Sequence, residues 1–367
     1  MLIPKIRDVE AIPISMPFTM SLTSGKMETL DRANSIVIRV VLEDGTVGIG
    51  EAKSSYQVLG ESHASVCHAI KEWISPRICG MAVSDIEAIS ARLSVIKGNA
   101  SAKSGIDMAI HDAWARVLGI PLYRLLGGFK NKIDLTWILG QASTDHMCED
   151  ALSAHAKGFN AFKIKIGKDP KKDIEVVTRL RKALGDQAFL YVDGNQGLLY
   201  GEAVKTLVAI EDMVAMVEDP ISIDDHVGRR RLADKLKIPM LGDECGTNVA
   251  DVRREIDLGI VRVMNVKPMR SGFTESVKMI RMMEQASILN LTGTLLETDL
   301  GALASAHLTA ALRAFAYPAE LTYWLKMEGR LLENGPAAVN GSLTLPEAPG
   351  LGASLNMDIV RRYQIAL

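Results

Sequence analysis

The sequence has few of the features that mark secreted, membrane or nucleic-acid-binding proteins. Its four cysteines form no Cys-x-x-Cys pair and no regular spacing, so neither a zinc site nor a disulfide framework is indicated. No run of about 18 consecutive apolar residues occurs, and the first residues lack the apolar core of a signal peptide. A net charge of −2 argues against a nucleic-acid partner. We therefore expect a cytoplasmic protein with reduced thiols and no membrane partner.

The 367 residues suit a barrel of about 250 residues with a smaller second unit. Residues 4–51 alternate as strands do, and Asp44-Gly45 between two β-branched runs predicts a hairpin. Residues 61–120 have helical spacing, with a last helix that ends at Gly119. The first 125 residues are therefore expected to form an α+β unit.

From about residue 134, short apolar runs alternate with amphipathic helical segments, which predicts parallel strands. The runs are LTWIL (135–139), AFKIKI (161–166), FLYVD (189–193), MVAMVE (213–218), PMLGDE (239–244), VRVMNVK (261–267), ILNLTG (288–293) and AELTYW (319–324). Eight such units predict an α/β fold with a closed (β/α)8 barrel over residues 126–330. The alternative is an open doubly wound sheet, although no glycine-rich phosphate loop follows the first strand. We expect residues 331–367 to leave the barrel and return to the unit at 1–125.

Charged residues stand at the ends of successive predicted strands, where barrel enzymes carry their catalytic groups. Asp193, Glu218, Asp243 and Lys267 follow one another at intervals of 25, 25 and 24 residues, which is one β/α unit each. Lys163 and Lys165 end the second run, Glu244 follows Asp243, and Glu320 lies in the eighth run. These side chains should therefore meet at one rim of the barrel.

Three carboxylates that converge without compensation repel one another, so the group of Asp193, Glu218 and Asp243 is stable only if some of them are protonated or a cation binds. All-oxygen ligands favour Mg²⁺ or Mn²⁺. Lys165 and Lys267 would flank this metal, with pKa values lowered enough for one of them to act as a base. A metal on a substrate carboxylate would stabilise the enolate that remains after the α-proton is removed.

Each residue alone has a simpler interpretation. A Lys-x-Lys pair is often an exposed strand edge, and a single Asp or Glu at a strand end often caps the next helix. Asn195 could be a cap, Glu244 could only bond its neighbours, and His307 is most simply a helix residue. The functional interpretation rests on the joint pattern, in which five successive strands end in such charges at one-unit spacing.

The motifs KIK (163–165), DGN (193–195), VEDP (217–220), GDE (242–244) and NVKP (265–268) resemble the enolase superfamily. The lysine of the sixth strand and the segments GIGEA (48–52), TGTLLETDLGALASAH (292–307) and PGLG (349–352) resemble its muconate-lactonizing subgroup in the mandelate racemase/muconate lactonizing enzyme family.

This resemblance implies roles for individual residues. Asp193, Glu218 and Asp243 would bind the metal, Lys165 would be the acid or base on one face of the substrate, and Lys267 the base or stabilising cation on the other. Lys163 would tune Lys165. The residues expected beside the metal or substrate are Asn195, Glu244, Glu297, Glu320 and Tyr56. The N-terminal unit would cap the barrel with loops around 19–26 and 53–60, and the enzyme is expected to be a homo-oligomer.

The resemblance leaves the reaction open. The loop KSSYQVLG (53–60) is shorter than in muconate cycloisomerases, and Asp219 and Cys245 replace a frequent Gln and Ser. The segment LTYWLKM (321–327) lacks the Asp-x-Asp pair expected for dipeptide epimerisation. We expect a muconate-type cycloisomerase. The alternatives are a racemase, epimerase or dehydratase of an N-acylamino or hydroxyproline-like acid, and a catalytically silent relative that serves binding or structure.

Overall fold

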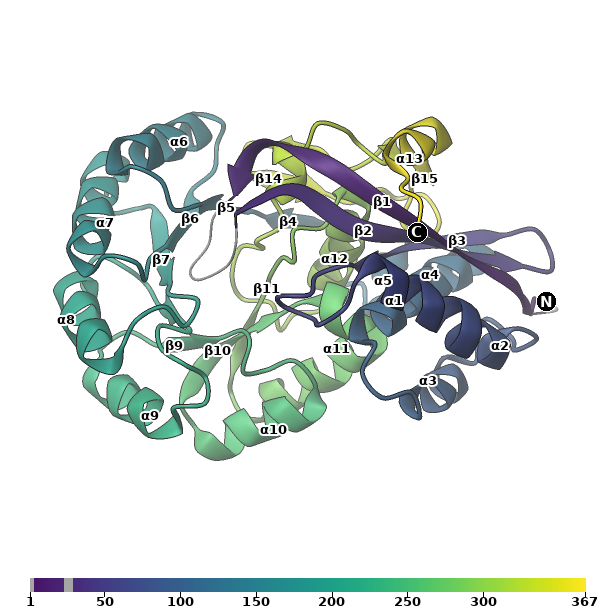
Figure 1. Cartoon of the computed structure of the whole chain (residues 1–367), viewed down its shortest axis with the longest axis horizontal. Coiled ribbons are helices and arrows are strands. Elements are labelled where there is room, and N and C mark those ends of the chain that lie inside the picture. Colours follow the sequence, from purple (N-terminus) through teal and green to yellow (C-terminus); the bar gives the residue numbers. More distant parts are fainter. Residues whose placement is uncertain (1–2, 23–28) are drawn as a thin grey trace.

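The computed structural model describes residues 3–22 and 29–367. Of the predicted capping loop at 19–26, residues 23–26 lie outside this part of the chain. In the described part, no helix is long and apolar enough to cross a membrane. Figure 1 shows a curved array of helices and strands on one side and a sheet with smaller helices on the other.

The N-terminal unit contains the antiparallel strands β1 (Ile6–Leu22), β2 (Leu30–Leu42) and β3 (Val47–Lys53), which pair in sequence order. The hairpin predicted at Asp44-Gly45 is confirmed, with Gly45 at a φ of 88°. The helical elements that follow are α1 (His63–His68), η1 (Ala69–Ile74), α2 (Ser75–Ile78), α3 (Ile86–Ser94), α4 (Ala100–Leu118) and α5 (Leu122–Leu126). Gly119 ends α4 as predicted, in the left-handed conformation.

Helix α4 lies directly on β3, and the glycines of the GIGEA motif explain how this is possible. A Cβ on Gly48 would lie 2.1 Å from O of Ala109, and one on Gly50 would lie 2.3 Å from O of Gly105. No side chain fits at either strand position, so the helix backbone can approach the sheet closely. This contact fixes the end of β3, from which Lys53 and the loop at 53–60 extend.

In the described part of the chain, seven parallel strands pair in sequence order, each followed by a helix, as the alternating pattern predicts. The strands are β5 (Thr136–Leu139), β6 (Ala161–Lys165), β7 (Phe189–Asp193), β8 (Val217–Glu218), β9 (Met240–Gly242), β10 (Val261–Val266) and β11 (Leu289–Thr292). The helices are α6 (Thr144–Ala156), α7 (Pro170–Leu184), α8 (Tyr200–Ile210), α9 (His226–Lys235), α10 (Val249–Leu258), α11 (Pro268–Gln285) and α12 (Asp299–Ala311). The predicted fold class is confirmed.

The eighth barrel segment differs from the strand predicted at 319–324. Ala319 forms a single parallel bridge with Leu135, and the N–H of Glu320 donates to O of Thr292 at 2.8 Å, so the segment hydrogen-bonds to both neighbouring strands. The chain then turns into a 3-10 helix, η2 (Tyr323–Lys326), in place of a strand and an eighth barrel helix. The turn redirects the chain toward the N-terminal sheet, where Met327 pairs with Phe18.

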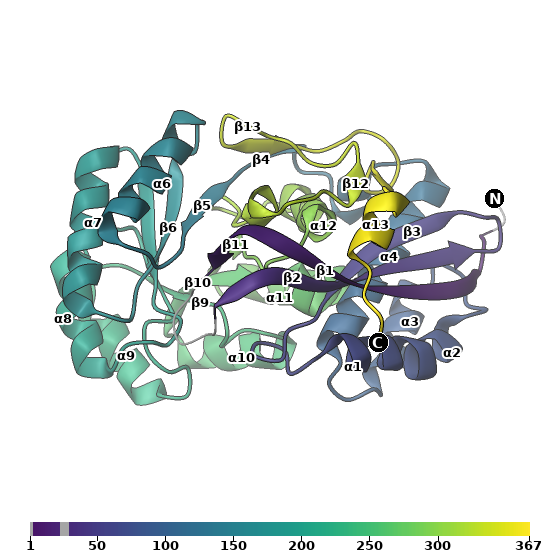
Figure 2. The same ribbon diagram turned by 45° about the horizontal axis from the view of Figure 1, so that its top comes forward.

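The C-terminal segment crosses back over the N-terminal sheet (Figure 2). It contains β12 (Leu332–Glu333), β13 (Ala338–Val339), β14 (Ser342–Thr344), β15 (Ser354–Leu355) and α13 (Met357–Tyr363), and β14 pairs with β4 (Lys132–Asp134). The N–H of Ile365 donates to O of Pro13 at 3.0 Å. The division of the chain at residues 125 and 330 stays a prediction.

The N-terminal sheet has an apolar core on each face. Ile36 and Ile38 pack with the helices of the N-terminal unit, whereas Val37 on the other face joins the core shared with the barrel. This alternation is what a sheet covered on both sides requires. The sheet is therefore held firmly against the barrel, and its edge can contribute residues to a pocket between the two units.

Candidate active site

The predicted residues at the strand ends meet at one level of the barrel. Lys165 pairs with Asp193 in the register of β6 and β7, and Asp193 pairs with Glu218 in the register of β7 and β8. Asp243 directly follows β9 and Lys267 directly follows β10. The structure thus brings together the five charged residues that the spacing singled out.

Lys163 lies at the centre of the carboxylates. Its Nζ is 2.9 Å from Oδ2 of Asp193, 2.8 Å from Oε1 of Glu218 and 2.9 Å from Oε1 of Glu320. Burial lowers the pKa of Lys163, but these three carboxylates outweigh burial and raise it well above the usual value for lysine. Lys163 is therefore a permanent cation that neutralises the barrel interior, which is a different task from that of an acid or base.

Lys165 and Lys267 lie on opposite sides of the barrel mouth, because β7, β8 and β9 separate their strands. Nζ of Lys165 donates to Oδ2 of Asp193 and to Oδ1 of Asn195, both at 2.7 Å. Lys267 forms its ion pair with Asp243. Each lysine is therefore oriented by one of the two outer carboxylates.

The carboxylates differ in their tendency to lose a proton. Burial raises the pKa of Glu218 well above its usual value, and the neighbouring Asp193 and Glu320 raise it further. For Asp193, burial is outweighed by Lys163 and Lys165, which hold its pKa below its usual range. Two lysines therefore compensate the charge of Asp193, whereas Lys163 alone does not offset burial and the neighbouring carboxylates at Glu218.

The spacing predicted three carboxylates without compensating charge, but the structure places lysines beside them. Nζ atoms of the lysines lie among the carboxylates, and Arg270 donates to Oδ1 of Asp243 at 3.2 Å. In residues 3–22 and 29–367, no three His, Cys, Asp or Glu side chains are arranged as metal ligands. Ammonium groups therefore offset part of the negative charge of these carboxylates.

The donor set nevertheless fits a hard divalent cation. Asp193, Glu218 and Asp243 are all buried, and they offer only oxygen atoms. Oε2 of Glu218 accepts no hydrogen bond, although it lies 2.8 Å from Nζ of Lys163. The Lys163 ammonium already lies close to this oxygen, and a metal ion there would add a second positive charge beside it.

Three further predicted residues, Glu320, Asn195 and Glu244, lie beneath the rim, beside Lys165 and in the pocket lining. Glu320 accepts hydrogen bonds from Lys163 and, at 2.7 Å, from the hydroxyl of Tyr191, so it belongs to the interior beneath the rim. The backbone of Asn195 is left-handed, with a φ of 39°, and this conformation turns its amide toward Lys165. Glu244 lines the pocket, and its N–H donates to Oδ2 of Asp219 at 2.9 Å. The left-handed backbone of Asn195 is a kind of strain that is often found at functional sites.

Tyr56 is exposed at the pocket, whereas Glu297 is buried. Tyr56 is exposed and lines the pocket from the loop at 53–60. Glu297 is buried behind the β11–α12 loop, where it accepts the N–H of Leu295 at 2.6 Å and the hydroxyl of Thr294 at 3.0 Å, and it is not among the described pocket-lining residues. It shapes the loop from behind and does not face the pocket.

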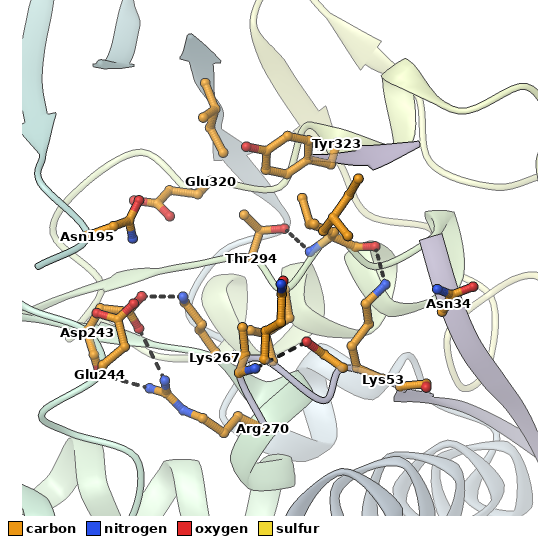
Figure 3. A pocket seen from close by; sticks show the side chains of 18 of the residues that line it. Asn34, Lys53, Asn195, Asp243, Glu244, Lys267, Arg270, Thr294, Glu320 and Tyr323 are labelled. Atoms are coloured by element: carbon orange, nitrogen blue, oxygen red, sulfur yellow. Dashed lines mark hydrogen bonds and ion pairs between the residues drawn. The ribbon is translucent and has the colours of Figure 1, made fainter. Parts of the chain in front are cut away.

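A pocket of about 150 Å³ lies between the strand ends and the N-terminal unit (Figure 3). Its lining includes residues that the sequence argument missed, namely Arg32, Asn34, Arg270, Leu295, Leu296 and Tyr323. Arg270 could have been found, because it lies three residues after Lys267 in the first turn of α11. Lys53 begins the loop at 53–60 that the resemblance placed over the barrel, but only the structure shows that its side chain lines the pocket.

Comparisons with known proteins identify the family of this chain. The family model "Mandelate racemase / muconate lactonizing enzyme, N-terminal domain" matches residues 5–127, and "Enolase C-terminal domain-like" matches residues 146–359. The L-Ala-D/L-Glu epimerase of Clostridium acetobutylicum is 31% identical, covering 93% of this chain and 95% of that protein. Muconate cycloisomerase 1 of Pseudomonas putida is 30% identical, covering 92% of each.

Solved structures similar to this chain likewise include enzymes that catalyse different reactions. A muconate lactonizing enzyme from Pseudomonas fluorescens complexed with muconolactone has a TM-score of 0.95 and 29% identity, over 99% of this chain and 100% of that one. A dipeptide epimerase from Enterococcus faecalis, complexed with Mg and a dipeptide, has a TM-score of 0.91 and 29% identity, over 95% and 99%. Enzymes of different specificity thus resemble this chain about equally.

Proposed function

Because the chain belongs to the mandelate racemase/muconate lactonizing enzyme family of the enolase superfamily, we propose that it moves a proton at the carbon next to a substrate carboxylate. The observation that carries this proposal is the placement of Lys165 and Lys267 on opposite sides of a pocket, each beside a buried carboxylate. A substrate between them has one amine on each face of its α-carbon. Positioned acids and bases of this kind accelerate proton transfer about 10²- to 10⁴-fold.

We propose that Asp193, Glu218 and Asp243 hold Mg²⁺ or Mn²⁺. Bound there, the cation would supply positive charge to the substrate carboxylate as negative charge builds up on it. The burial of three carboxylates that offer only oxygen atoms supports this assignment. Lys163 keeps Glu218 and Glu320 oriented below the site.

Within this class, we propose cycloisomerisation of a muconate-type dicarboxylate. One carboxylate oxygen bonds to an alkene carbon, and the alkene electrons move toward the other carboxylate as an enolate. The Lys165 ammonium then gives its proton to the α-carbon, so the atoms of substrate and product balance. The similarity to muconate cycloisomerase and to the lactonizing enzyme structure supports this choice.

The second candidate is racemisation, epimerisation or dehydration of an amino-acid-derived carboxylate, such as an N-acylamino or hydroxyproline-like acid. The two opposed lysines favour it, because one can remove the α-proton and the other can return a proton to the opposite face. A free α-ammonium group is less suitable, since the chain after Glu320 offers no Asp-x-Asp pair to bind it.

Proton NMR in D₂O with Mg²⁺ or Mn²⁺ tests the proposal on cis,cis-muconate, N-acylamino acids and hydroxyprolines. Deuterium in a muconolactone supports cycloisomerisation, and deuterium at the α-carbon of an amino-acid derivative supports racemisation. Loss of water from a hydroxy acid would instead support a dehydratase. An absence of exchange with every compound would refute the proposal and favour a catalytically silent relative.

We also propose that the enzyme acts in the cytoplasm as a homo-oligomer on a small carboxylate, without nucleic-acid or membrane partners. The near-neutral net charge and the four free cysteines support this setting. Sedimentation velocity on the purified chain would test the oligomeric state.

A further inference from the structure

The end of the pocket away from the barrel is formed by the N-terminal sheet. Lys53 ends β3, and its side chain is buried, with 4% of its surface exposed. Arg32 and Asn34 of β2 line the same end of the pocket. In Figure 3, Lys53 and Asn34 lie on one side of the cavity, with Asp243 and Asn195 on the other.

Cations outnumber acids along the described lining of the pocket. The cationic residues are Arg32, Lys53, Lys163, Lys165, Lys267 and Arg270, and the acidic residues are Asp243, Glu244 and Glu320. The barrel lysines and Arg270 are paired with carboxylates, some of which lie just beneath the lining. At the N-terminal end no acidic residue among those described lines the pocket, and the acids nearest Lys53 are the buried Glu51 and Glu297 beneath the lining.

Lys53 has little compensation at that end. Among the described residues, its Nζ has one hydrogen-bond acceptor, O of Leu296 at 2.9 Å, although an ammonium group has three donors. Glu51 lies nearby, but its oxygens accept hydrogen bonds from Ser35, Thr298 and Gly301. A buried lysine that faces a cavity with one neutral partner is well suited to bind an anion.

Lys53 is mostly charged at neutral pH, as the binding of an anion requires. Burial lowers the pKa of Lys53 to about 8, while Glu51 and Glu297 raise it in part. Lys53 is thus mostly protonated at neutral pH, and a bound anion would favour its charged form further.

We propose that Lys53 binds a second anionic group of the substrate, a carboxylate distant from the reacting α-carbon. The inference rests on the proposed function for the placement of the first carboxylate, and it narrows the substrate class to dicarboxylates. Muconate-type diacids and N-acylamino acids with a carboxylate in the acyl group both belong to this class. Substrates with a neutral, apolar tail do not.

The alternative is that Lys53 only secures the β11–α12 loop. Leu296, whose carbonyl it binds, has a φ of 61°, a left-handed conformation that side chains rarely adopt. A purely structural lysine would affect the binding of every ligand equally. An anion-binding lysine distinguishes ligands by the charge of their tail.

Isothermal titration calorimetry with adipate and hexanoate separates these alternatives without turnover. Both probes have six carbons, and only adipate has a second carboxylate. In the presence of Mg²⁺, we expect adipate to bind about ten- to hundredfold more tightly than hexanoate. Glutarate and pimelate, which are one carbon shorter and longer, would measure the spacing between the two anion sites.

The Lys53→Gln variant should lose this preference and bind adipate and hexanoate alike, whereas Lys53→Arg should retain it. Lys71→Gln, which removes an exposed lysine of the same unit, serves as the matched control and should retain the preference. Melting temperatures of the variants show whether each one is folded.

Two results would overturn the inference. The first is wild-type affinity for adipate no greater than for hexanoate, including no binding of either. The second is an adipate preference that survives in folded Lys53→Gln. If adipate is preferred through Lys53 but no carboxylate exchanges deuterium, the proposed reaction is wrong and the anion site stands.

Discussion

The two ends of the pocket are built differently. At the barrel end, Lys163, Lys165 and Lys267 alternate with carboxylates in a dense network, and each comes from the end of a strand. At the N-terminal end, Lys53 has one carbonyl partner among the described residues, and Tyr56 extends from the adjoining loop. In our proposals, the barrel end moves a proton and the N-terminal end selects the substrate.

This difference accounts for the pattern of similarity. Proteins of about 30% identity to this chain include an L-Ala-D/L-Glu epimerase and a muconate cycloisomerase, which differ in substrate. A rigid barrel rim can keep one chemistry while the residues of an attached sheet and its loops vary. Changes at the barrel end should therefore abolish catalysis, and changes at the other end should alter specificity or stability.

Removal of the divalent cation should have the largest effect on the barrel end. We expect EDTA to reduce deuterium exchange below detection and added Mg²⁺ or Mn²⁺ to restore it, because Asp193, Glu218 and Asp243 offer a cation only oxygen atoms. Exchange is measured by proton NMR, with a dialysed sample that received no EDTA as control. Full exchange in metal-free protein would contradict the assignment.

The next largest effect should follow loss of Lys165. We expect Lys165→Ala to lower the rate of exchange about 10²- to 10⁴-fold without a change in melting temperature, because the proton loses its carrier on one face. Lys168→Ala, in an exposed lysine three residues away, is the matched control. If Lys165→Ala exchanges protons at the wild-type rate, Lys165 is not the acid or base.

Glu51 tests the contact between β3 and the start of α12, which connects the two ends of the pocket. Its oxygens accept hydrogen bonds from N–H of Thr298 and Gly301 and from the hydroxyl of Ser35, so Glu51→Ala leaves buried donors without partners. We expect the free energy of unfolding to fall by about 3 to 5 kcal/mol, measured by urea denaturation. Glu43→Ala, at an exposed position near the same strand, should change it little. An equal loss of unfolding free energy in both variants would argue against a stabilising role of the Glu51 contact.

The smallest expected effect concerns Glu297 and depends on pH. Burial raises the pKa of Glu297 from 4.5 to about 7, so the folded protein keeps a proton there that the unfolded chain loses. The stability from this proton is complete at low pH and is lost as the pH rises through about 7.

Glu297→Gln lacks this titration. Relative to wild type, its free energy of unfolding should therefore increase between about pH 5 and pH 8, by up to about 3 kcal/mol. Urea denaturation at several pH values measures the difference. A difference that does not vary with pH would show that Glu297 titrates normally in the folded state.

The regular part of the fold was predictable, because each β/α unit has its own local signal. Short apolar runs, helical periodicity and Asp44-Gly45 were sufficient for the barrel class and the first hairpin. The eighth segment was not predictable in this way. The apolar residues of AELTYW match a strand, but Tyr323 and Trp324 form a 3-10 helix because the chain there turns toward the N-terminal sheet.

The sequence by itself determined the charged rim, because parallel strands with one-unit spacing bring Asp193, Glu218, Asp243 and Lys267 to one level. Only the tertiary structure decided how those charges are balanced, since the ion pairs depend on side-chain directions inside a closed barrel. It also decided that Lys53, at the start of the loop expected to cap the barrel, reaches the carbonyl of Leu296. That contact joins residues 243 positions apart, through the packing of one unit on another, and no local pattern encodes it.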